Sequence, residues 1–120
     1  MNDPEPERAS GRTEDVGPAL AVALEAAAEV LDPPPTVRTT VGVTTWSVAG
    51  QPIVSLSAAS ASFRVGPEIG AAARNTPDAG DSPLGREWVV FSPSSLDGHA
   101  MDRITAWFAA AHRRARPATR

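Results

Sequence analysis

The residues that could carry out chemistry are few in this chain, and several of them stand together before one expected helix. Ser94, Ser95, Asp97 and His99 supply the residue types of a hydrolase triad. A working triad needs these groups to converge in space beside an oxyanion hole, and closeness along one helix start does not supply this. Ser94 with Asp97 three residues later also fits a variant of the capping box. We therefore expect helix capping here and no catalytic residue.

Metal ligands and phosphate loops are equally sparse. His99 and Asp102 are three positions apart and share one face of the expected helix, and Glu68 is a third donor from elsewhere. Zinc requires at least three protein ligands, and the chain has two histidines and no cysteine. Gly80 and Gly85 lack the Gly-Lys-Ser/Thr ending of a phosphate-binding loop. The sequence predicts no metal and no cofactor.

Arginine offers the chemistry that the sequence favours most. Arg64 lies on the solvent side of a strong strand, just before Gly66 and an expected helix start, which is a favourable place for an anion. Together with Arg38, which we expect on a neighbouring strand, it would form a small anion-binding patch. The alternative is that Arg64 covers apolar surface with its aliphatic stem. The candidate contacts for an anion or ligand are therefore Arg38, Arg64 and Trp46.

The other aromatic and basic features have plainer interpretations. Trp46, Trp88 and Trp107 could stack on bases or a ligand, but large aromatics in a chain with 5% aromatic content are typical core anchors. At least one of them is expected to be partly exposed. The arginines at 113, 114 and 116 could meet phosphate, although such a run is more often a solvated helix end.

Length and composition limit the class of protein. A chain of 120 residues suits one domain and can bury about two-thirds of its unfolded surface. Its net charge of −3 offers no general attraction for nucleic acid or for an anionic membrane. No apolar run approaches the ~20 residues of a membrane span, and the N-terminus lacks the basic start and apolar core of a signal peptide. We expect a cytoplasmic protein without membrane contact.

The charge is unevenly distributed along the chain. Residues 1–17 carry five acids and two arginines with one large aliphatic side chain, so we expect a disordered acidic tail. Residues 18–116 would form one domain, and residues 117–120 a short basic tail. All 11 basic residues are Arg, and alanine is abundant, which is typical of a GC-rich bacterial genome.

The expected elements follow from the hydrophobic periodicity. Leu20, Leu24 and Leu31 fall on one face of a helix that Pro18 begins and Asp32 ends before three prolines. From Thr36 the period changes to two, which is typical of strands. In order, we expect a helix at 19–31, a strand from 36 that shifts phase near 44–45 through a bulge or short turn, a hairpin turn at 49–50, strands at 53–56 and 61–65, a short helix at 68–74, a surface loop at 75–86, a strand at 87–91 and a last helix capped by Ser94.

Helices that gather at the ends of a strand meander indicate an α+β fold. We expect an antiparallel sheet of about four to five strands, with the N-terminal, short middle and C-terminal helices packed on one face. The last helix would bury one stripe of side chains against that sheet: Ala100, Met101, Ile104, Trp107, Phe108 and Ala111.

Three short stretches resemble small bacterial domains of the MmcQ/YjbR family and, as a close second, the N-terminal domain of the TfoX family. They are the hairpin Trp46 to Ile53, the strand and helix start Phe63 to Glu68, and the closing strand and helix at 88–90 and 106–115. Arg64 stands where those families usually carry Lys. The Met-Phe-Gly-Gly signature of TfoX-type domains is replaced by Val41-Gly42-Val43. The resemblance implies the fold and a nucleic-acid or protein partner, and it transfers no active-site residue.

Two classes of function follow as expectations. The first is a non-catalytic binding or interaction domain of the MmcQ/YjbR-like type, with a protein partner or a second copy of the chain. The alternative is a nucleic-acid-associated regulator like the TfoX-type domains, although the acidic balance predicts weak, non-specific nucleic-acid binding at most. An enzyme has the least support.

Overall fold

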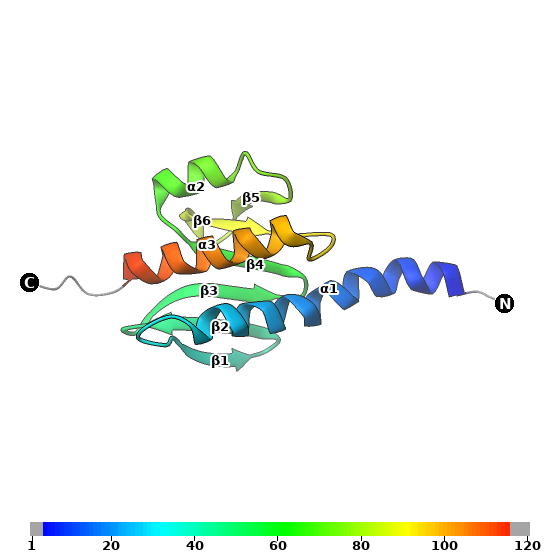
Figure 1. Cartoon of the computed structure of the whole chain (residues 1–120), viewed down its shortest axis with the longest axis horizontal. Helices are drawn as coiled ribbons and strands as arrows, with labels where there is room; N and C mark the ends of the chain where they lie inside the picture. The colour runs from blue at the N-terminus through cyan, green and yellow to red at the C-terminus, as the bar shows by residue number, and fades with distance from the viewer. Residues whose placement is uncertain (1–3, 116–120) are drawn as a thin grey trace, which may run out of the picture.

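A computed structural model describes the backbone of residues 4–115 and the side chains of residues 16–115. The expected basic tail at 117–120 lies outside the described residues. The helices and strands in chain order (Figure 1) are α1 (Pro4–Glu29), β1 (Thr36–Thr40), β2 (Val43–Val48), β3 (Gln51–Ser57), β4 (Ser60–Arg64), α2 (Pro67–Ala73), β5 (Ala79–Ser82), β6 (Gly85–Phe91) and α3 (Gly98–Ala115).

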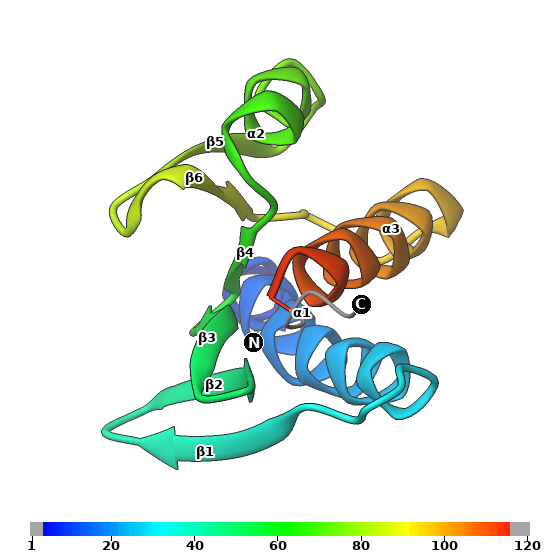
Figure 2. The same cartoon turned by 90° about the vertical axis from the view of Figure 1, so that its left-hand side faces the viewer.

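The six strands form one antiparallel sheet in the order β1-β2-β3-β4-β6-β5. This confirms the α+β class and the antiparallel sheet, with one strand more than expected. α1 and α3 lie side by side over one face of the sheet, and α2 packs against β6 near the β5 edge (Figure 2). The other face carries no helix within the described part of the chain.

α1 begins at Pro4, so the predicted helix start at Pro18 is wrong. The preceding stretch contains Glu, Arg and Ala, which favour helix on their own, and Pro18 lies inside the helix instead of opening it. The buried side chains described for α1 begin with Val16. Gly17 passes so close to the β3–β4 turn that a Cβ atom would lie 3.1 Å from the carbonyl oxygen of Ala58. The expected disorder of residues 1–17 stays a prediction.

Three two-residue turns connect the first four strands. The turn expected at Ala49-Gly50 is confirmed, and both residues adopt the positive φ of a tight hairpin, 54° and 79°. The first turn lies at Val41-Gly42, earlier than the phase shift at 44–45 suggested. Val41 has φ 52°, an uncommon conformation for a β-branched residue, so its type pointed to a continuing strand. A register shift occurs separately, between Trp46 and Ser47.

The segment expected to be a surface loop at 75–86 contains strand β5. Its sequence Ala-Gly-Asp-Ser has low strand propensity, and it becomes a strand because it pairs along β6. β6 then lies between two strands, as expected for a stretch that is apolar on both faces.

The start of α3 differs from the expected cap. Asp97, not Ser94, stands before the first helical residue, and its Oδ1 accepts the backbone N–H of Ala100 at 2.9 Å. The short polar side chain of Asp serves an N-cap as well as Ser does, so the local signature did not distinguish them. The expected buried stripe of α3 is confirmed except for Met101, which remains 37% exposed.

The core lies between the sheet and the two helices α1 and α3. Phe108 contacts Trp46 and Phe63 edge to face, and Trp107 contacts Phe63 and Phe91 in the same way, with ring centroids 5.3–6.3 Å apart. Edge-to-face rings add stabilisation beyond the burial of their area. Two of the three tryptophans, Trp46 and Trp107, are therefore core anchors. Their contacts hold α3 against one face of the sheet.

Candidate functional site

The uncovered face of the sheet is rich in small hydroxyl side chains. Side chains alternate between the two faces of a strand, so Thr45, Ser55 and Ser62, which follow or precede buried core residues, point away from the helices. Register places the following row on the uncovered face, from the β1 edge inwards: Arg38, Thr45, Ser55, Ser62 and Val90. Short hydroxyl groups leave room above the sheet and can hydrogen-bond to a ligand.

The β5–β6 hairpin bends over part of this face. The register shift between Asp81 and Ser82 bends the tip of the hairpin toward the side opposite α1 and α3 (Figure 2). The hydroxyl oxygens of Ser62 and Ser82 then lie 3.0 Å apart, across the intervening strand, and both serines are buried. The backbone N–H of Leu84 donates to Ser82 as well. The bend builds one wall of a groove.

Three pockets that share lining residues lie along this groove. An inner pocket of about 330 Å³ lies where the last turn of α3 meets the sheet and is lined by Gln51, Arg64, Ala111, Arg114 and Ala115. A middle pocket of about 390 Å³ lies under the bent hairpin and is lined by Pro52, Arg64 and residues 84–88. An outer pocket of about 470 Å³ next to β1 is lined by Thr36, Val37, Arg38, Thr45, Ser47, Gly50 and Pro52. Arg64 joins the first two pockets, and Pro52 joins the last two.

The charges along this groove are strongly unequal. Among the described residues that line the three pockets, four are arginines, namely Arg38, Arg64, Arg86 and Arg114, and one is acidic, Glu87. The partly buried ring of Trp88 lies between them in the middle pocket. A chain with a net charge of −3 therefore presents a locally basic groove that suits an anionic ligand.

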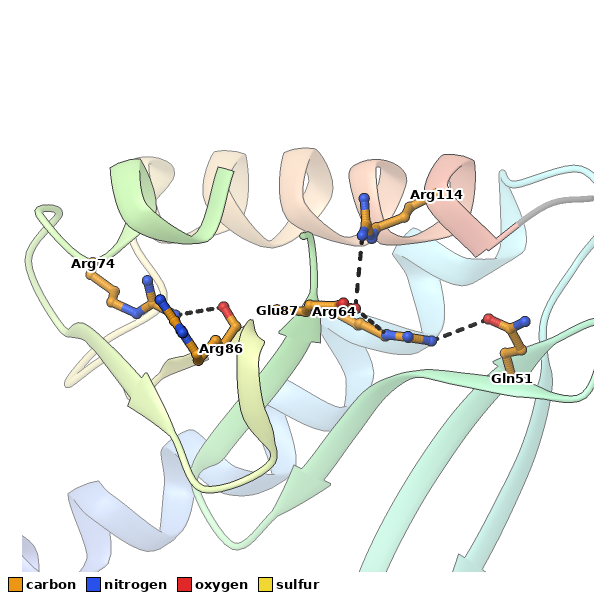
Figure 3. A network of polar contacts seen from close by, with 6 residues as sticks. All are labelled: Gln51, Arg64, Arg74, Arg86, Glu87 and Arg114. Atoms are coloured by element: carbon orange, nitrogen blue, oxygen red, sulfur yellow. Dashed lines mark hydrogen bonds and ion pairs between the residues drawn. The ribbon is translucent and has the colours of Figure 1, made fainter. Parts of the chain in front are cut away.

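Arg64 is held by two side chains at the end of β4 (Figure 3). Its Nε donates to Oε1 of Glu87 at 3.0 Å, and its Nη1 donates to Oε1 of Gln51 at 3.1 Å. Arg114 approaches the same Glu87 oxygen from α3, with Nη2 at 3.8 Å. Two guanidinium groups thus share one carboxylate and keep one net positive charge. The side chains of Arg64, Glu87 and Arg114 are 35–44% exposed.

Gly66 sets the position of Arg114. This glycine joins β4 to α2 with φ 95° and ψ 163°, a conformation that only glycine adopts readily. A Cβ atom there would lie 2.9 Å from Nη1 of Arg114 and 3.0 Å from its Cζ. The guanidinium group therefore lies against the bare backbone of Gly66, and a larger residue there would require it to shift.

Arg74 has a structural position and does not line the groove. From the end of α2 it donates through Nη2 to the carbonyl oxygens of Arg86 and Trp88, at 2.8 and 3.3 Å, and its Nε lies 2.8 Å from Asp81. These contacts provide hydrogen bonds to two carbonyl oxygens of β6, next to the place where the register between β5 and β6 shifts. Arg74 thus ties α2 to the bent hairpin that forms the groove wall.

The structure separates the three contact residues expected from sequence. Arg64 lines the inner and middle pockets, and Arg38 lines the outer one. The expectation of neighbouring strands is wrong, because β2 and β3 lie between β1 and β4. Trp46 lines none of the three pockets, because it is 2% exposed and packs on Phe108.

Sequence reasoning missed Gln51, Glu87 and Trp88 as groove residues. Trp88 pairs with Arg64 across the sheet, so knowledge of the β4–β6 pairing would have placed it on the same face. Gln51 and Glu87 carry no local signal, since each is simply a polar residue near a strand end. Arg114 was noticed as part of a basic helix end, and its place in a pocket depends on how α3 packs.

The two histidines lie apart from the groove. His99 is exposed at the start of α3, and His112 is buried, with Nε2 2.7 Å from the carbonyl oxygen of Pro33. Within residues 16–115 no three His, Cys, Asp or Glu side chains gather as metal ligands would. In the same part of the chain, no helix has the length and apolar character to cross a membrane.

Comparison with family models, with curated proteins and with solved structures yields no match to this chain. The function is therefore inferred from the geometry of the groove.

Proposed function

We propose that this chain is a non-catalytic binding domain, of the MmcQ/YjbR-like type, whose arginine groove holds an anionic partner. The observation that carries the proposal is the sharing of lining residues. Because Arg64 and Pro52 each border two pockets, the four arginines line neighbouring pockets that share walls. A groove of this kind suits an elongated ligand with several negative groups.

The lining favours binding over catalysis. Among the described side chains of the groove there is no histidine, and the single carboxylate is paired with Arg64. General acid–base and nucleophilic mechanisms need a base held against the reacting group. Guanidinium groups with Ser and Thr hydroxyls supply recognition by hydrogen bonds and charge instead.

The alternative is a nucleic-acid-associated regulator of the TfoX-like type. One observation favours it, namely that Trp88 is partly exposed and lies beside Arg64 and Arg86 in the middle pocket. An aromatic ring next to guanidinium groups can stack on an unpaired base, which contributes about 1–3 kcal/mol per base. Single-stranded nucleic acid would then bind more tightly than duplex.

Fluorescence anisotropy with the full chain tests the proposal. The probes are a labelled acidic peptide, a labelled single-stranded oligonucleotide and a labelled duplex, each at two salt concentrations. We expect measurable peptide binding that weakens with salt and falls about 5–20-fold in Arg64→Gln, because one charge-assisted contact is lost. Arg103→Gln, which removes the same charge from a residue outside the groove, should change affinity by less than about two-fold.

The same titration decides between the two functions. For duplex DNA we expect a Kd no tighter than the ~10⁻⁴–10⁻⁶ M of non-specific contact. Nanomolar binding of single-stranded nucleic acid that is lost in Trp88→Ala would replace the peptide-binding proposal by the alternative. Equal losses in Arg64→Gln and Arg103→Gln would show that the groove has no specific role.

A further inference from the structure

Glu87 is the one acidic side chain among the described residues that line the groove, and it lies where two of the arginines meet. Its Oε1 is 3.0 Å from Nε of Arg64 and 3.8 Å from Nη2 of Arg114. Figure 3 shows the carboxylate between the end of β4 and the last turn of α3, with Arg64 reaching on toward Gln51. A carboxylate already occupies the place that an anionic ligand would take.

The contacts of Glu87 are of the kind that a ligand can replace. All three side chains are 35–44% exposed, and an exposed ion pair contributes only about 0–1 kcal/mol. At 3.8 Å, Arg114 is too far from Glu87 for a hydrogen bond, so its donors remain available to a second acceptor. Removal of the Glu87 side chain from the pair leaves the backbone contact of Glu87 with Gly66 intact, since that bond uses the carbonyl oxygen.

We infer that Glu87 is a built-in competitor, and that the ligand is an extended acidic peptide segment whose carboxylate displaces Glu87 from Arg64 and Arg114. The inference rests on the proposed function, because it names the partner of the same groove. In the free protein Glu87 keeps the two guanidinium groups in place. In the complex a carboxylate of the partner takes over both, and Glu87 turns toward solvent.

The shape of the groove favours a peptide over nucleic acid. The inner pocket, at about 330 Å³, is at the small end of ligand sites and has Ala111 and Ala115 on one wall, which suits a carboxylate on a short aliphatic stem. At its other end the groove reaches β1, an edge strand whose five residues are all exposed and whose outer side pairs with no described strand. An extended peptide can add to such an edge through its backbone.

A second copy of the chain is a poorer occupant of the same edge. Arg38 is the central residue of β1, so two antiparallel β1 strands paired about a two-fold axis at their centres would place Arg38 opposite Arg38. Like charges directly opposite each other in a sheet are destabilising. An acidic segment meets the same arginine with the opposite charge.

The test compares Glu87→Gln with the wild-type full chain. The probes are a fluorescein-labelled hexaglutamate peptide and an oligothymidylate of equal charge, titrated at low and at 0.5 M salt. We expect Glu87→Gln to bind the peptide about three- to five-fold more tightly, as expected when an exposed ion pair no longer competes. Arg114→Gln in the Glu87→Gln background should remove this gain.

Asp81→Asn is the matched control. It removes the same charge from an exposed residue that pairs with Arg74 away from the inner pocket. We expect less than about a 1.5-fold change at 0.5 M salt, because salt at this concentration screens an exposed charge that does not contact the peptide. An equal gain in Asp81→Asn and Glu87→Gln would overturn the inference in favour of overall charge.

The remaining outcomes separate this inference from the proposed function. If Arg64→Gln weakens binding while Glu87→Gln does not strengthen it, the inference that Glu87 competes with the ligand is wrong and the proposed function stands. If neither the wild type nor Glu87→Gln binds either probe, both are wrong. A larger gain for the oligothymidylate than for the peptide would overturn the peptide as partner.

A measurement on the unmodified protein avoids reliance on a variant that fails to fold. The Nε–H signal of Arg64 in a ¹⁵N-labelled sample reports its hydrogen bond to Glu87. We expect this signal to shift on addition of the hexaglutamate peptide, with the same midpoint as the anisotropy change. Binding without any shift of this signal would overturn the inference that a peptide carboxylate replaces Glu87 on Arg64.

Discussion

The same strands present two different surfaces, one on each face of the sheet. Across the covered face run Trp46, Val54, Phe63 and Val89, and each of them is between 0 and 2% exposed. The neighbouring positions in these strands face the other way, and they place hydroxyl groups and arginines on the uncovered face. The covered face holds most of the apolar area removed from water, which is the main source of folding free energy. The uncovered face is therefore free to vary in chemistry.

The contrast explains how an acidic chain comes to have a basic groove. Burial selects apolar residues at alternate positions and leaves the positions between them unconstrained by packing. Arginines at 38, 64 and 86 occupy such positions on three strands, and α3 adds Arg114 at the end of the sheet. The groove combines the uncovered face with the end of α3, and it is invisible in the net charge.

The largest expected effect comes from replacing one tryptophan on each face. Trp107→Ala should lower the free energy of unfolding by about 3–5 kcal/mol, as truncation of a buried aromatic does, because Trp107 packs on Phe63 and Phe91. Trp88→Ala should cost about 1 kcal/mol or less, because its ring is partly exposed in the groove. Urea denaturation followed by circular dichroism measures both. Similar losses of unfolding free energy in the two variants would show that the two faces contribute equally to stability.

A smaller effect is expected at the border between the faces, at Gly66. Gly66→Ala should destabilise the protein by about 1–3 kcal/mol because of its φ of 95°. It should also weaken binding of the acidic peptide, since the new Cβ would displace Arg114. Gly98→Ala is the control, because a Cβ there meets no atom within 4 Å. Thermal unfolding and anisotropy report the two effects, and unchanged peptide affinity in Gly66→Ala would show that Arg114 does not need this position.

The smallest effects belong to the hydroxyl groups of the uncovered face. Ser62→Ala should cost about 1 kcal/mol, the usual value of one hydrogen bond, because it loses the contact that holds the bent hairpin. Ser55→Ala lies beside it in the same row and should stay within about 0.5 kcal/mol. Urea denaturation of both variants provides the measurement. A cost above about 2 kcal/mol at Ser55 would mean that the uncovered face contributes to stability as well.

The amino-acid sequence by itself determined the class of the fold and most of its elements. Alternation with period two and the helical stripe around Trp107 are local signals, since each depends on residues within a few positions. The turn at Ala49-Gly50 and the start of α2 at Pro67 are local for the same reason. The errors also have local causes, such as Val41 in a turn, Asp97 in place of Ser94 as the cap, and a strand at 79–82 whose residues disfavour strands.

Only the tertiary structure decided which of these residues share a site. Arg64, Gln51 and Arg114 come from three elements and meet because β3 begins where β4 and α3 end. The sequence singled out Arg38, Arg64 and Trp46, but strand order separates the two arginines and packing buries the tryptophan. Trp88, from β6, lies beside Arg64 instead of Trp46, because β4 pairs with a strand more than twenty residues later in the chain. Periodicity shows that a strand has two faces, whereas only the packing of the helices decides which face is buried and which remains open to a partner.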